Sequence, residues 1–532
     1  MPKTFNTTAV CIPEMHYMVN IESQLKEITQ LVDAGKYFAI NRARQYGKTT
    51  TLISLIRYLQ ERYHMVSIDF QTLGNADFTT EAIFSSAFAG SFLESFALVK
   101  PEMTEALRNA IENIAQNIDD DKFTLRPLFQ KLAVICAASD KPVVLIIDEV
   151  DSAANNQVFL DFLAQLRAQY IRRFQQPAFW SVILAGVYDI KNLKQKLRPE
   201  NEHKYNSPWN IAADFKVDMS FSKDGIAGMI QEYDNDYHLG MNIDEMAGLL
   251  YDYTSGYPFL VSRLCQLMDE DVSIQKEYGS KKTTWTKKGF LEAVRILLSE
   301  KNTLFESLIG KLHDAPKLGT MLKTLLFTGR AFSYSADESV IDMATMFGFI
   351  KNLNGTVAIA NRIFEMRLYN YYLSEDEIQG TDIGKASLRE KNRFIVDGHL
   401  NMRRILEKFV VHFTDIYGGR DEKFLEEEAR QYFLLYLRPI INGTGNYYIE
   451  ARTRDLRRTD VIVDYGGEQY IIEMKIWHGE EYNKRGEQQL LGYLDDYHID
   501  RGYMLSFCFN RNKEIGVHDI FIGGKEITEA VV

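Results

Sequence analysis

Asn41-Arg-Ala-Arg-Gln-Tyr-Gly-Lys-Thr-Thr-Thr51 stands between a short apolar run and an amphipathic segment. The run before it, Tyr37-Phe-Ala-Ile40, predicts a buried β-strand. The segment after it predicts a helix, because its apolar residues recur at helical spacing: Leu52, Ile53, Leu55, Ile56 and Leu59. A strand, a tight loop carrying Gly-Lys-Thr and a helix together form the arrangement of a phosphate-binding loop.

Each polar residue of such a loop has a chemical task. The loop N–H groups and the helix N-terminus meet a polyphosphate, Lys48 reaches its outer phosphates, and the Thr49 hydroxyl binds Mg²⁺. We therefore expect ATP and Mg²⁺ as cofactors. The candidate nucleotide-binding residues of the loop are Arg42, Arg44, Tyr46, Gly47, Lys48, Thr49 and Thr50. The pattern G-x-x-x-x-G-K-[ST] is met except at its first position, where Arg42 replaces glycine.

A second segment, Lys141-Pro-Val-Val-Leu-Ile-Ile-Asp-Glu-Val-Asp151, is an apolar run that ends in carboxylates. A run apolar on both faces suits a central strand of a parallel sheet. Asp148 would hold the Mg²⁺ and Glu149 would polarise the water that attacks the γ-phosphate. Taken alone, the segment fits a core strand with a solvated acidic end equally well. In this order, the two segments predict a P-loop ATPase.

Length and composition limit the class of protein. A chain of 532 residues suggests three or four domains, and 46% hydrophobic with 25% charged residues indicates a globular protein. No run is apolar for long enough to span a bilayer, and the N-terminus lacks a signal-peptide pattern. The cysteines show no pairing or metal spacing, so we expect a cytoplasmic location without membrane contact. The net charge of −12 confines any nucleic-acid contact to a local basic patch.

Further strands are predicted on both sides of the carboxylate segment. Met65–Phe70 and Phe179–Gly186 read as strands, and residues 78–137 read as mainly helical. Asp69 is either a residue near the nucleotide or a cap at the strand end. In related ATPases a polar sensor of the γ-phosphate lies at the end of the later strand, and Ser181 and Asp189 are the candidates here.

The middle of the chain predicts two helical modules. In Thr254-Ser-Gly-Tyr-Pro-Phe-Leu-Val-Ser-Arg-Leu264, the Gly-x-Pro can lay backbone against an adenine ring, with Pro258 as a candidate binding residue and Arg263 directed at the phosphates. The alternative is a plain helix start with proline in its first turn. Residues 300–375 alternate short helices with Val357-Ala-Ile-Ala360, which suits a winged-helix module that contacts DNA or serves for packing.

The last part of the chain carries a second set of chemical groups. A helix around residues 424–437 and a strand at 447–451 precede strands at 461–464 and 469–476, joined by a Gly466-Gly467 hairpin. Glu473 and Lys475 share one face of their strand, and Asp460 heads the paired strand. Two carboxylates and a lysine can hold Mg²⁺ and orient a water for phosphodiester cleavage. A solvated Glu-x-Lys pair on an exposed strand is the alternative.

Basic residues lie next to this candidate metal site. Four cations in an otherwise acidic chain form a local patch suited to a phosphate backbone: Arg452, Arg454, Arg457 and Arg458. Downstream, Gln489 and Tyr493 lie one turn apart on a predicted helix and can face the site.

These residues carry a resemblance to known families. The segment from Tyr37 through the predicted lid helix resembles the AAA-like ATPase domains of bacteria and archaea, including an Arg-x-Arg-Gln-Tyr-Gly-Lys-Thr form of the loop. The C-terminal part resembles the PD-(D/E)XK nuclease superfamily as fused to such ATPases. The resemblance implies that Asp460 and Glu473 are metal ligands and that Lys475 orients the water. It also implies an acidic helix position at Glu428, with Glu426 and Glu427 as alternatives, and an active-site lining by Gln489 and Tyr493.

The predicted organisation is an α/β P-loop NTPase core with a parallel sheet (1–220), a helical lid (221–300), a winged-helix module (301–375), a linker (376–399) and a small α/β PD-(D/E)XK domain (400–532). The predicted function is ATP-dependent, Mg²⁺-dependent cleavage of nucleic acid, with DNA as the expected partner. One alternative is an ATP-dependent signalling switch whose C-terminal domain binds nucleic acid or protein without cleavage. Another is an ATP-dependent DNA-handling protein linked to a mobile element or phage defence, with cutting conditional on a partner. The expected partners also include another protein or further copies of this chain in a homo-oligomer.

Overall fold

The computed structural model of the protein describes residues 2–118, 120–187, 209–328, 332–374, 393–417, 429–441, 445–449, 459–476, 487–488, 490–495, 497–508 and 514–532. Within these ranges the side chains of residues 328, 373, 416–417, 429–430, 446–449, 459–460 and 476 are not described. The chain divides into two compact units. The N-terminal unit comprises Thr8–Phe221 with Met346–Gly348, and the C-terminal unit comprises Met1–Thr7, Ser222–Thr345 and Phe349–Val532.

The N-terminal unit is built on a four-stranded parallel sheet, as the sequence predicts. Its strands follow the order β1 (Tyr37–Asn41), β4 (Ser181–Gly186), β3 (Val143–Asp148) and β2 (His64–Asp69). All six residues of β3 are buried, because β3 is flanked by strands on both sides and covered on both faces. The carboxyl ends of the strands meet at one edge of the sheet, so the residues that follow them are brought together.

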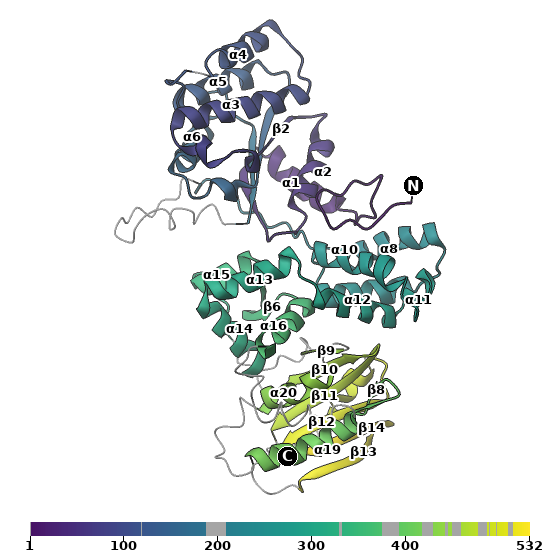
Figure 1. Ribbon diagram of the computed structural model, residues 1–532. Helices are drawn as coiled ribbons and strands as arrows, with labels where there is room; N and C mark the ends of the chain where they lie inside the picture. Colours follow the sequence, from purple (N-terminus) through teal and green to yellow (C-terminus); the bar gives the residue numbers. More distant parts are fainter. Residues whose placement is uncertain are drawn as a thin grey trace. The chain divides into compact units, whose positions relative to one another are not determined.

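Helices cover both faces of this sheet (Figure 1). One face packs against α1 (Glu22–Asp33) and α2 (Lys48–Leu59), and Leu52, Leu55 and Leu59 of α2 are buried there, as their spacing predicts. The other face packs against α3 (Glu81–Leu98), α4 (Glu105–Ala115), α5 (Leu125–Ala138) and α6 (Gln157–Arg172). In α3, phenylalanines recur every fourth residue, which places a continuous aromatic stripe against the core: Phe84, Phe88, Phe92 and Phe96.

The first part of the C-terminal unit is mainly helical (Figure 1). Its larger helices up to residue 299 are α8 (Lys223–Tyr237), α9 (Ile243–Thr254), α10 (Pro258–Gln266) and α12 (Lys287–Ser299). The next elements are α13 (Thr303–Asp314), α14 (Pro316–Thr328), α15 (Ser339–Met346), the antiparallel hairpin β5 (Ile350–Leu353) and β6 (Thr356–Ile359), and α16 (Arg362–Ser374). Helices followed by a two-stranded hairpin are the elements of a winged-helix module, but the predicted limits of lid and module remain predictions.

A six-stranded mixed sheet forms the second part of this unit, after α19 (Met402–Tyr417) and α20 (Ala429–Ile441). The strand order is β13 (Gly516–Ile522), β14 (Lys525–Val531), β12 (Arg501–Phe507), β11 (Glu468–Ile476), β10 (Thr459–Tyr465) and β9 (Gly445–Ile449). Strands β11, β12 and β14 run parallel, whereas the remaining neighbours are antiparallel. The sequence predicts β9, β10 and β11 and the turn at Gly466-Gly467, whereas it did not single out β12, β13 or β14.

A short hairpin of β7 (Ile395–Val396) and β8 (His399–Leu400) lies within the range expected to be a linker. The Leu400 N–H donates a hydrogen bond to the Tyr470 hydroxyl at 3.1 Å, and His399 lies 2.9 Å from Glu468. These contacts attach the hairpin to β11. The hairpin therefore packs against the six-stranded sheet, and the predicted limits of the linker remain predictions.

Buried polar side chains join the six-stranded sheet to the helices of the same unit. The Tyr253 hydroxyl of α9 donates to Asp464 Oδ2 at 2.7 Å, and Gln469 Nε2 donates to Asp464 Oδ1 at 2.9 Å. The guanidinium of Arg362 lies 5.4 Å from the centre of the Tyr253 ring and donates to the Tyr497 hydroxyl at 2.9 Å. Because a buried carboxylate needs partners, this cluster specifies how α9, α16 and the hairpin β10–β11 pack.

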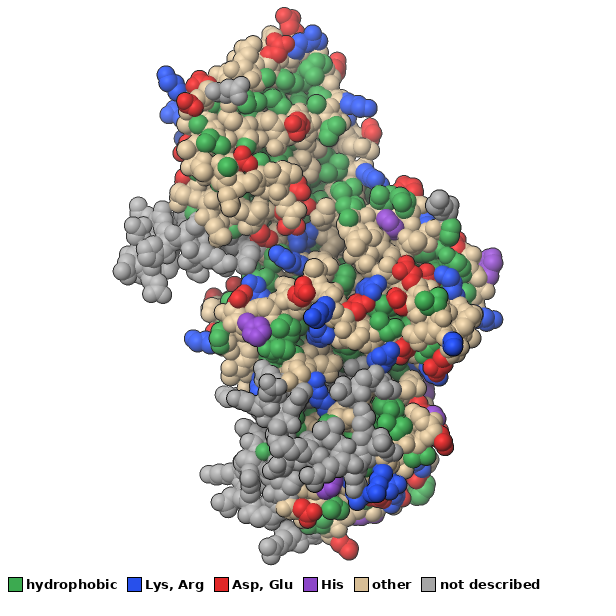
Figure 2. Space-filling model, in the orientation of Figure 1, with side chains coloured by type: hydrophobic (Ala, Val, Ile, Leu, Met, Phe, Trp, Pro, Cys, Tyr) green, Lys and Arg blue, Asp and Glu red, His purple; other side chains and the backbone are tan. Residues whose placement is uncertain are grey.

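Basic and acidic side chains are interspersed over the face drawn in Figure 2. No helix in the described part of the chain is both long and apolar enough to cross a bilayer.

Candidate functional site

The loop between β1 and α2 forms the centre of the candidate site. Gly47 has φ +77° and precedes the first residue of α2, and Gln45 also adopts a positive φ of 56°. Glycine adopts this left-handed conformation without steric cost, so the loop can turn tightly into the helix. The N–H groups of the first helical turn then face the loop, which is the arrangement that binds anions.

Lys48 is the buried cation of this loop, with 6% of its surface exposed. Its Nζ donates hydrogen bonds to the carbonyl oxygens of Arg42 and Ala43, both at 3.1 Å. Burial lowers the pKa of the Lys48 ammonium, and the nearby carboxylates of Glu149 and other acidic residues oppose this shift. The ammonium therefore lies over the loop backbone, within the arc where phosphates bind in a loop of this kind.

The two predicted Mg²⁺ ligands come together from separate elements. The Thr49 hydroxyl at the start of α2 donates to Asp148 Oδ2 at the end of β3, over 3.0 Å. Burial raises the pKa of the Asp148 carboxyl, whereas the hydrogen bonds from the Glu149 N–H and from Thr49 lower it. A hydroxyl and a carboxylate in contact offer the hard oxygen atoms that Mg²⁺ prefers, so the residues fit this ion.

Glu149 adopts an unusual backbone conformation next to this pair. Its φ of 52° and ψ of 41° are left-handed, and it caps the short 3₁₀ helix η3 (Val150–Ala153). Non-glycine residues rarely adopt this conformation, and such residues cluster at functional sites. Burial raises the pKa of the half-buried Glu149 carboxyl, and the Lys48 ammonium opposes this shift.

Two further carboxylates lie at the same edge of the sheet. Asp69 stands opposite Asp148 in the β2–β3 register and accepts a hydrogen bond from the Gln71 N–H at 2.8 Å, so it is both a cap and a neighbour of the site. Asp151 accepts a hydrogen bond from the Val187 N–H at 2.5 Å. No role was predicted for Asp151 from the sequence, although its place two residues after Glu149 was the available signal.

The remaining predicted loop residues are placed differently. Arg42 donates to the Val217 carbonyl at 2.6 Å, and its guanidinium lies 5.1 Å from the centre of the Phe215 ring. These contacts hold the Arg42 side chain against residues 215–217, and its nucleotide contact remains a prediction. Thr50 accepts a hydrogen bond from the Cys11 N–H at 3.2 Å, and Tyr46 packs against the core beside α1 and α2. The Arg44 side chain is exposed.

The predicted sensor and lid residues have described contacts of their own. Ser181 is buried at the amino end of β4 and donates to the Lys36 carbonyl at 2.5 Å, so it is structural, and Asp189 lies outside the described residues. In the C-terminal unit, Pro258 is the first residue of α10. Arg263 forms an ion pair with Glu300 and donates to Gln266 Oε1 at 2.7 Å. The nucleotide contacts of Pro258 and Arg263 remain predictions.

The second candidate site lies on the six-stranded sheet. Asp460 stands directly opposite Glu473 in the antiparallel register of β10 and β11, although the Asp460 side chain is not described. Glu473 is fully buried and Lys475 is 5% exposed, so the alternative of a solvated pair is wrong for these two residues. The other predicted members of this site lie outside the described residues: Glu428, Arg452, Arg454, Arg457, Arg458 and Gln489.

The face with Glu473 is partly covered by the helical residues 490–495. A Cβ atom added at Gly502 of β12 would lie 2.8 Å from a Leu494 methyl and 3.2 Å from Leu490, so only glycine permits this close approach. Tyr493 belongs to this helical stretch, as predicted. Among the described side chains no three His, Cys, Asp or Glu residues cluster as metal ligands, and this comparison leaves out Asp460.

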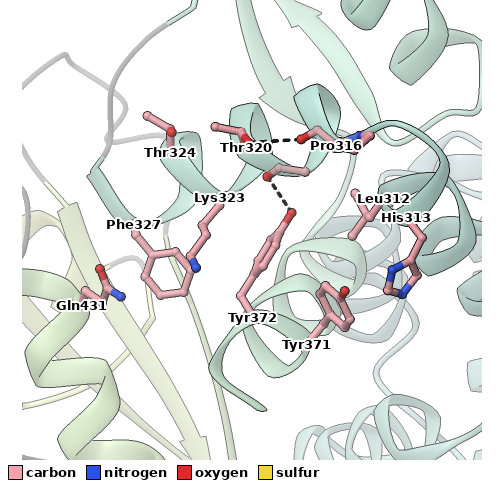
Figure 3. Close-up of a pocket in the computed structure, with 11 residues that line it drawn as sticks. Leu312, His313, Pro316, Thr320, Lys323, Thr324, Phe327, Tyr371, Tyr372 and Gln431 are labelled. Atoms are coloured by element: carbon pink, nitrogen blue, oxygen red, sulfur yellow. Dashed lines mark hydrogen bonds between the residues drawn. The ribbon is translucent and has the colours of Figure 1, made fainter. Parts of the chain in front are cut away.

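A separate cavity of about 580 Å³ lies among α13, α14 and α16 (Figure 3). Tyr371 and Tyr372 of α16 line it together with Lys323 of α14. The Tyr372 hydroxyl donates to the Gly319 carbonyl at 2.9 Å, which holds the ring in place. None of the residues predicted to carry chemistry lines this cavity, and we assign it no function.

The parallel sheet, the phosphate-binding loop and the Thr49–Asp148 contact define a P-loop ATPase-like domain. The model of the AAA-like domain family matches residues 8–372, so the chain belongs to this AAA-like family.

Individual proteins show more distant similarity. The chain is similar to the solved structure of a Walker-type ATPase of Pyrococcus abyssi, at 14% identity over 68% of this chain and 99% of that one, with a TM-score of 0.48. The ORC2 protein of Aeropyrum pernix shows 9% identity over 70% and 98%, with a TM-score of 0.37. An uncharacterised WD repeat-containing protein of Synechocystis sp. is 24% identical over an alignment of 262 residues that covers 46% of this chain and 19% of that protein.

Proposed function

We propose that the chain binds ATP and hydrolyses it at the loop between β1 and α2. The observation that carries this proposal is the 3.0 Å hydrogen bond from the Thr49 hydroxyl to Asp148, with Lys48 buried in the same loop. It brings a hydroxyl, a carboxylate and a cation to the N-terminus of α2. These are the groups that nucleotide binding and phosphoryl transfer require.

Each residue has a distinct task in this reaction. The N–H groups at the start of α2 and the Lys48 ammonium bind the phosphates and offset their negative charge. Thr49 and Asp148 would hold Mg²⁺, which supplies charge neutralisation across the phosphates when it is bound. Glu149 accepts a hydrogen bond from the attacking water and orients it toward the γ-phosphate.

The test compares wild type with Lys48→Ala. The variant is expected to lose ATP affinity by about 10- to 150-fold, because one charge-assisted contact contributes about 1.5–3 kcal/mol. Its fold should remain intact, since Lys48 contacts only backbone of its own loop among the hydrogen bonds described. Titration calorimetry with ATP and Mg²⁺ measures the affinity, with the exposed Lys26→Ala of α1 as control. Equal affinities in wild type and Lys48→Ala would overturn the proposal.

We also propose a second function, Mg²⁺-dependent cleavage of nucleic acid by the six-stranded sheet. The supporting observation is that Asp460 and Glu473 are register partners while Glu473 and Lys475 are buried on one face. Burying a carboxylate and an ammonium rarely increases stability over apolar residues, so their presence favours a chemical role. The carboxylates would hold the metal ion and Lys475 would stabilise charge near the attacking water.

A cleavage panel tests this second function. Linear, nicked and branched DNA and RNA are incubated with and without ATP and Mg²⁺, with wild type, Asp460→Asn and Glu473→Gln. Both variants should lose cleavage, because an amide is a poor ligand for a hard cation. The control is Glu468→Gln, an exposed glutamate of the same strand. Nucleic-acid binding that is indifferent to Mg²⁺, with no cleavage of any substrate, would favour a switch that binds without cutting.

A further inference from the structure

Asp151 connects the turn after β3 to the end of β4. It lies in η3, two residues after Glu149, and its Oδ2 accepts the Val187 N–H over 2.5 Å. Val187 directly follows the last residue of β4. A carboxylate that accepts a backbone N–H in this way forms a charge-assisted hydrogen bond, which is stronger than a neutral one.

Glycine at position 186 permits this contact. A Cβ atom added to Gly186 would lie 2.9 Å from Asp151 Oδ1 and 2.9 Å from a Val150 methyl, closer than real Cβ atoms approach such neighbours. Gly186 also pairs with Asn41 of β1, and its carbonyl accepts the Arg42 N–H at 3.1 Å. The end of β4 is therefore bonded to η3 on one side and to the start of the phosphate-binding loop on the other.

This connection bears on Glu149 because Glu149 caps η3. The Ser152 N–H donates to the Glu149 carbonyl at 3.1 Å, and the Ser152 hydroxyl donates to the Phe70 carbonyl at 3.0 Å. The turn that carries Glu149 is thus held toward β2 by Ser152 and toward β4 by Asp151. Loss of either contact would let the left-handed backbone of Glu149 relax, because strained conformations persist only where their surroundings hold them.

We propose that Asp151 is a positioning residue for ATP hydrolysis, which holds η3 against the end of β4 and so fixes Glu149 relative to the phosphate-binding loop. The proposal rests on the proposed hydrolysis of ATP at this loop. Asp151 acts through Glu149 and needs no contact with the nucleotide. Its loss therefore affects the rate of hydrolysis, whereas the affinity for ATP depends on Lys48, Thr49 and Asp148.

Three variants separate position from charge. Asp151→Ala removes both the hydrogen bond and the charge, Asp151→Asn keeps an oxygen acceptor without the charge, and Gly186→Ala displaces the carboxylate while keeping its charge. Asp151→Ala and Gly186→Ala should lower kcat at least about tenfold with KM within twofold of wild type, since a misplacement of about 1 Å can cost about 100-fold. Asp151→Asn should be intermediate.

The measurements are steady-state ATP hydrolysis and hydrogen exchange at the Val187 amide, on the full chain. Exchange at Val187 should accelerate in Asp151→Ala and Gly186→Ala, and the half-buried Asp161→Asn of α6 is the matched control. Equal losses in Asp151→Ala and Asp151→Asn, with Gly186→Ala like wild type, would show that only charge matters and would overturn the proposal. So would an unchanged kcat in Asp151→Ala, or a parallel rise in KM.

Failure of the proposed function gives a different result. If wild type shows no ATP turnover that Lys48→Ala abolishes, the proposed ATP hydrolysis is overturned, and the role of Asp151 with it. Wild-type turnover that survives both Asp151→Ala and Gly186→Ala would overturn the role of Asp151 alone. Should Gly186→Ala not fold, hydrogen exchange still decides, because a lower kcat in Asp151→Ala without faster exchange at Val187 would contradict positioning.

Discussion

Replacing Asp464 with asparagine is expected to remove a pH dependence from the stability of the C-terminal unit. Burial raises the pKa of the Asp464 carboxyl to about 6, from an ordinary value of 3.8. The hydrogen bonds from Gln469 and Tyr253 and the charges of Arg362 and Lys287 oppose this shift without cancelling it. The folded protein therefore holds a proton on Asp464 at a pH where the unfolded chain has lost it.

The sign of the effect follows from this difference in bound protons. Where the folded state binds more protons, stability falls as pH rises, so the contribution of Asp464 is complete below pH 3.8 and is lost as pH rises through about 6. A shift of about two units corresponds to about 3 kcal/mol. The asparagine side chain does not titrate, so Asp464→Asn lacks this loss.

Hydrogen exchange of the β10 and β11 amides, corrected for intrinsic exchange rates, measures the local stability between pH 4 and pH 7. Wild type should lose about 2 kcal/mol more than Asp464→Asn over this range, because part of the total loss falls below pH 4. The matched control is Asp495→Asn, whose aspartate is exposed. Parallel pH profiles for wild type and Asp464→Asn would refute the reasoning, because burial would then not have raised the pKa in solution.

Three further predictions concern the two candidate sites. Glu149→Gln should bind ATP and Mg²⁺ but lose turnover, and turnover of the variant at the wild-type rate would contradict this. Burial raises the pKa of the Glu149 carboxyl, and its protonated form cannot accept a hydrogen bond from water, so the kcat of wild type should fall on acidification at a pH above 4.5. Arg42→Ala should lower the stability of the N-terminal unit by about 1.5–3 kcal/mol, because it loses the bond to Val217, with ATP affinity within twofold of wild type; a tenfold weaker affinity at unchanged melting temperature would restore Arg42 to the nucleotide site. Lys475→Ala should slow cleavage of nucleic acid while Mg²⁺ still binds by calorimetry, and loss of the metal would instead make Lys475 part of the metal site.

Much of the N-terminal unit could be predicted from local sequence. The strand–loop–helix around Lys48 and the apolar run ending at Asp148 are short, continuous signals, since phosphate binding and a central strand each require particular residues at adjacent positions. The sequence also predicts the edge of the sheet at which these residues meet, because parallel strands present their carboxyl ends at the same edge. The contact between Thr49 and Asp148 is in this sense an expected result.

Side-chain partners distant in sequence could not be predicted in the same way. Arg42 replaces a loop glycine, and its hydrogen bond to the Val217 carbonyl joins residues 175 positions apart, so no local sequence pattern predicts this contact. Asp464 and Tyr253 are 211 residues apart, and a single aspartate in a strand indicates neither burial nor a partner on a helix. The strands β12, β13 and β14 were missed because long-range packing decides their places in the sheet, where β12 pairs with β11, β14 with β12 and β13 with β14.

The sequence by itself determined the chemistry available to this protein: a phosphate-binding loop, a carboxylate pair at a strand end, and a second group of acidic and basic residues near the C-terminus. These groups are specified by residue type and spacing, which a local stretch contains completely. Only the tertiary structure decided that Glu473 and Lys475 are buried, that Arg42 donates to the Val217 carbonyl, and that Asp151 accepts a hydrogen bond from the end of β4. Burial and hydrogen-bond partners arise when distant segments pack, and packing determines both the pKa of a carboxylate and the direction in which it points.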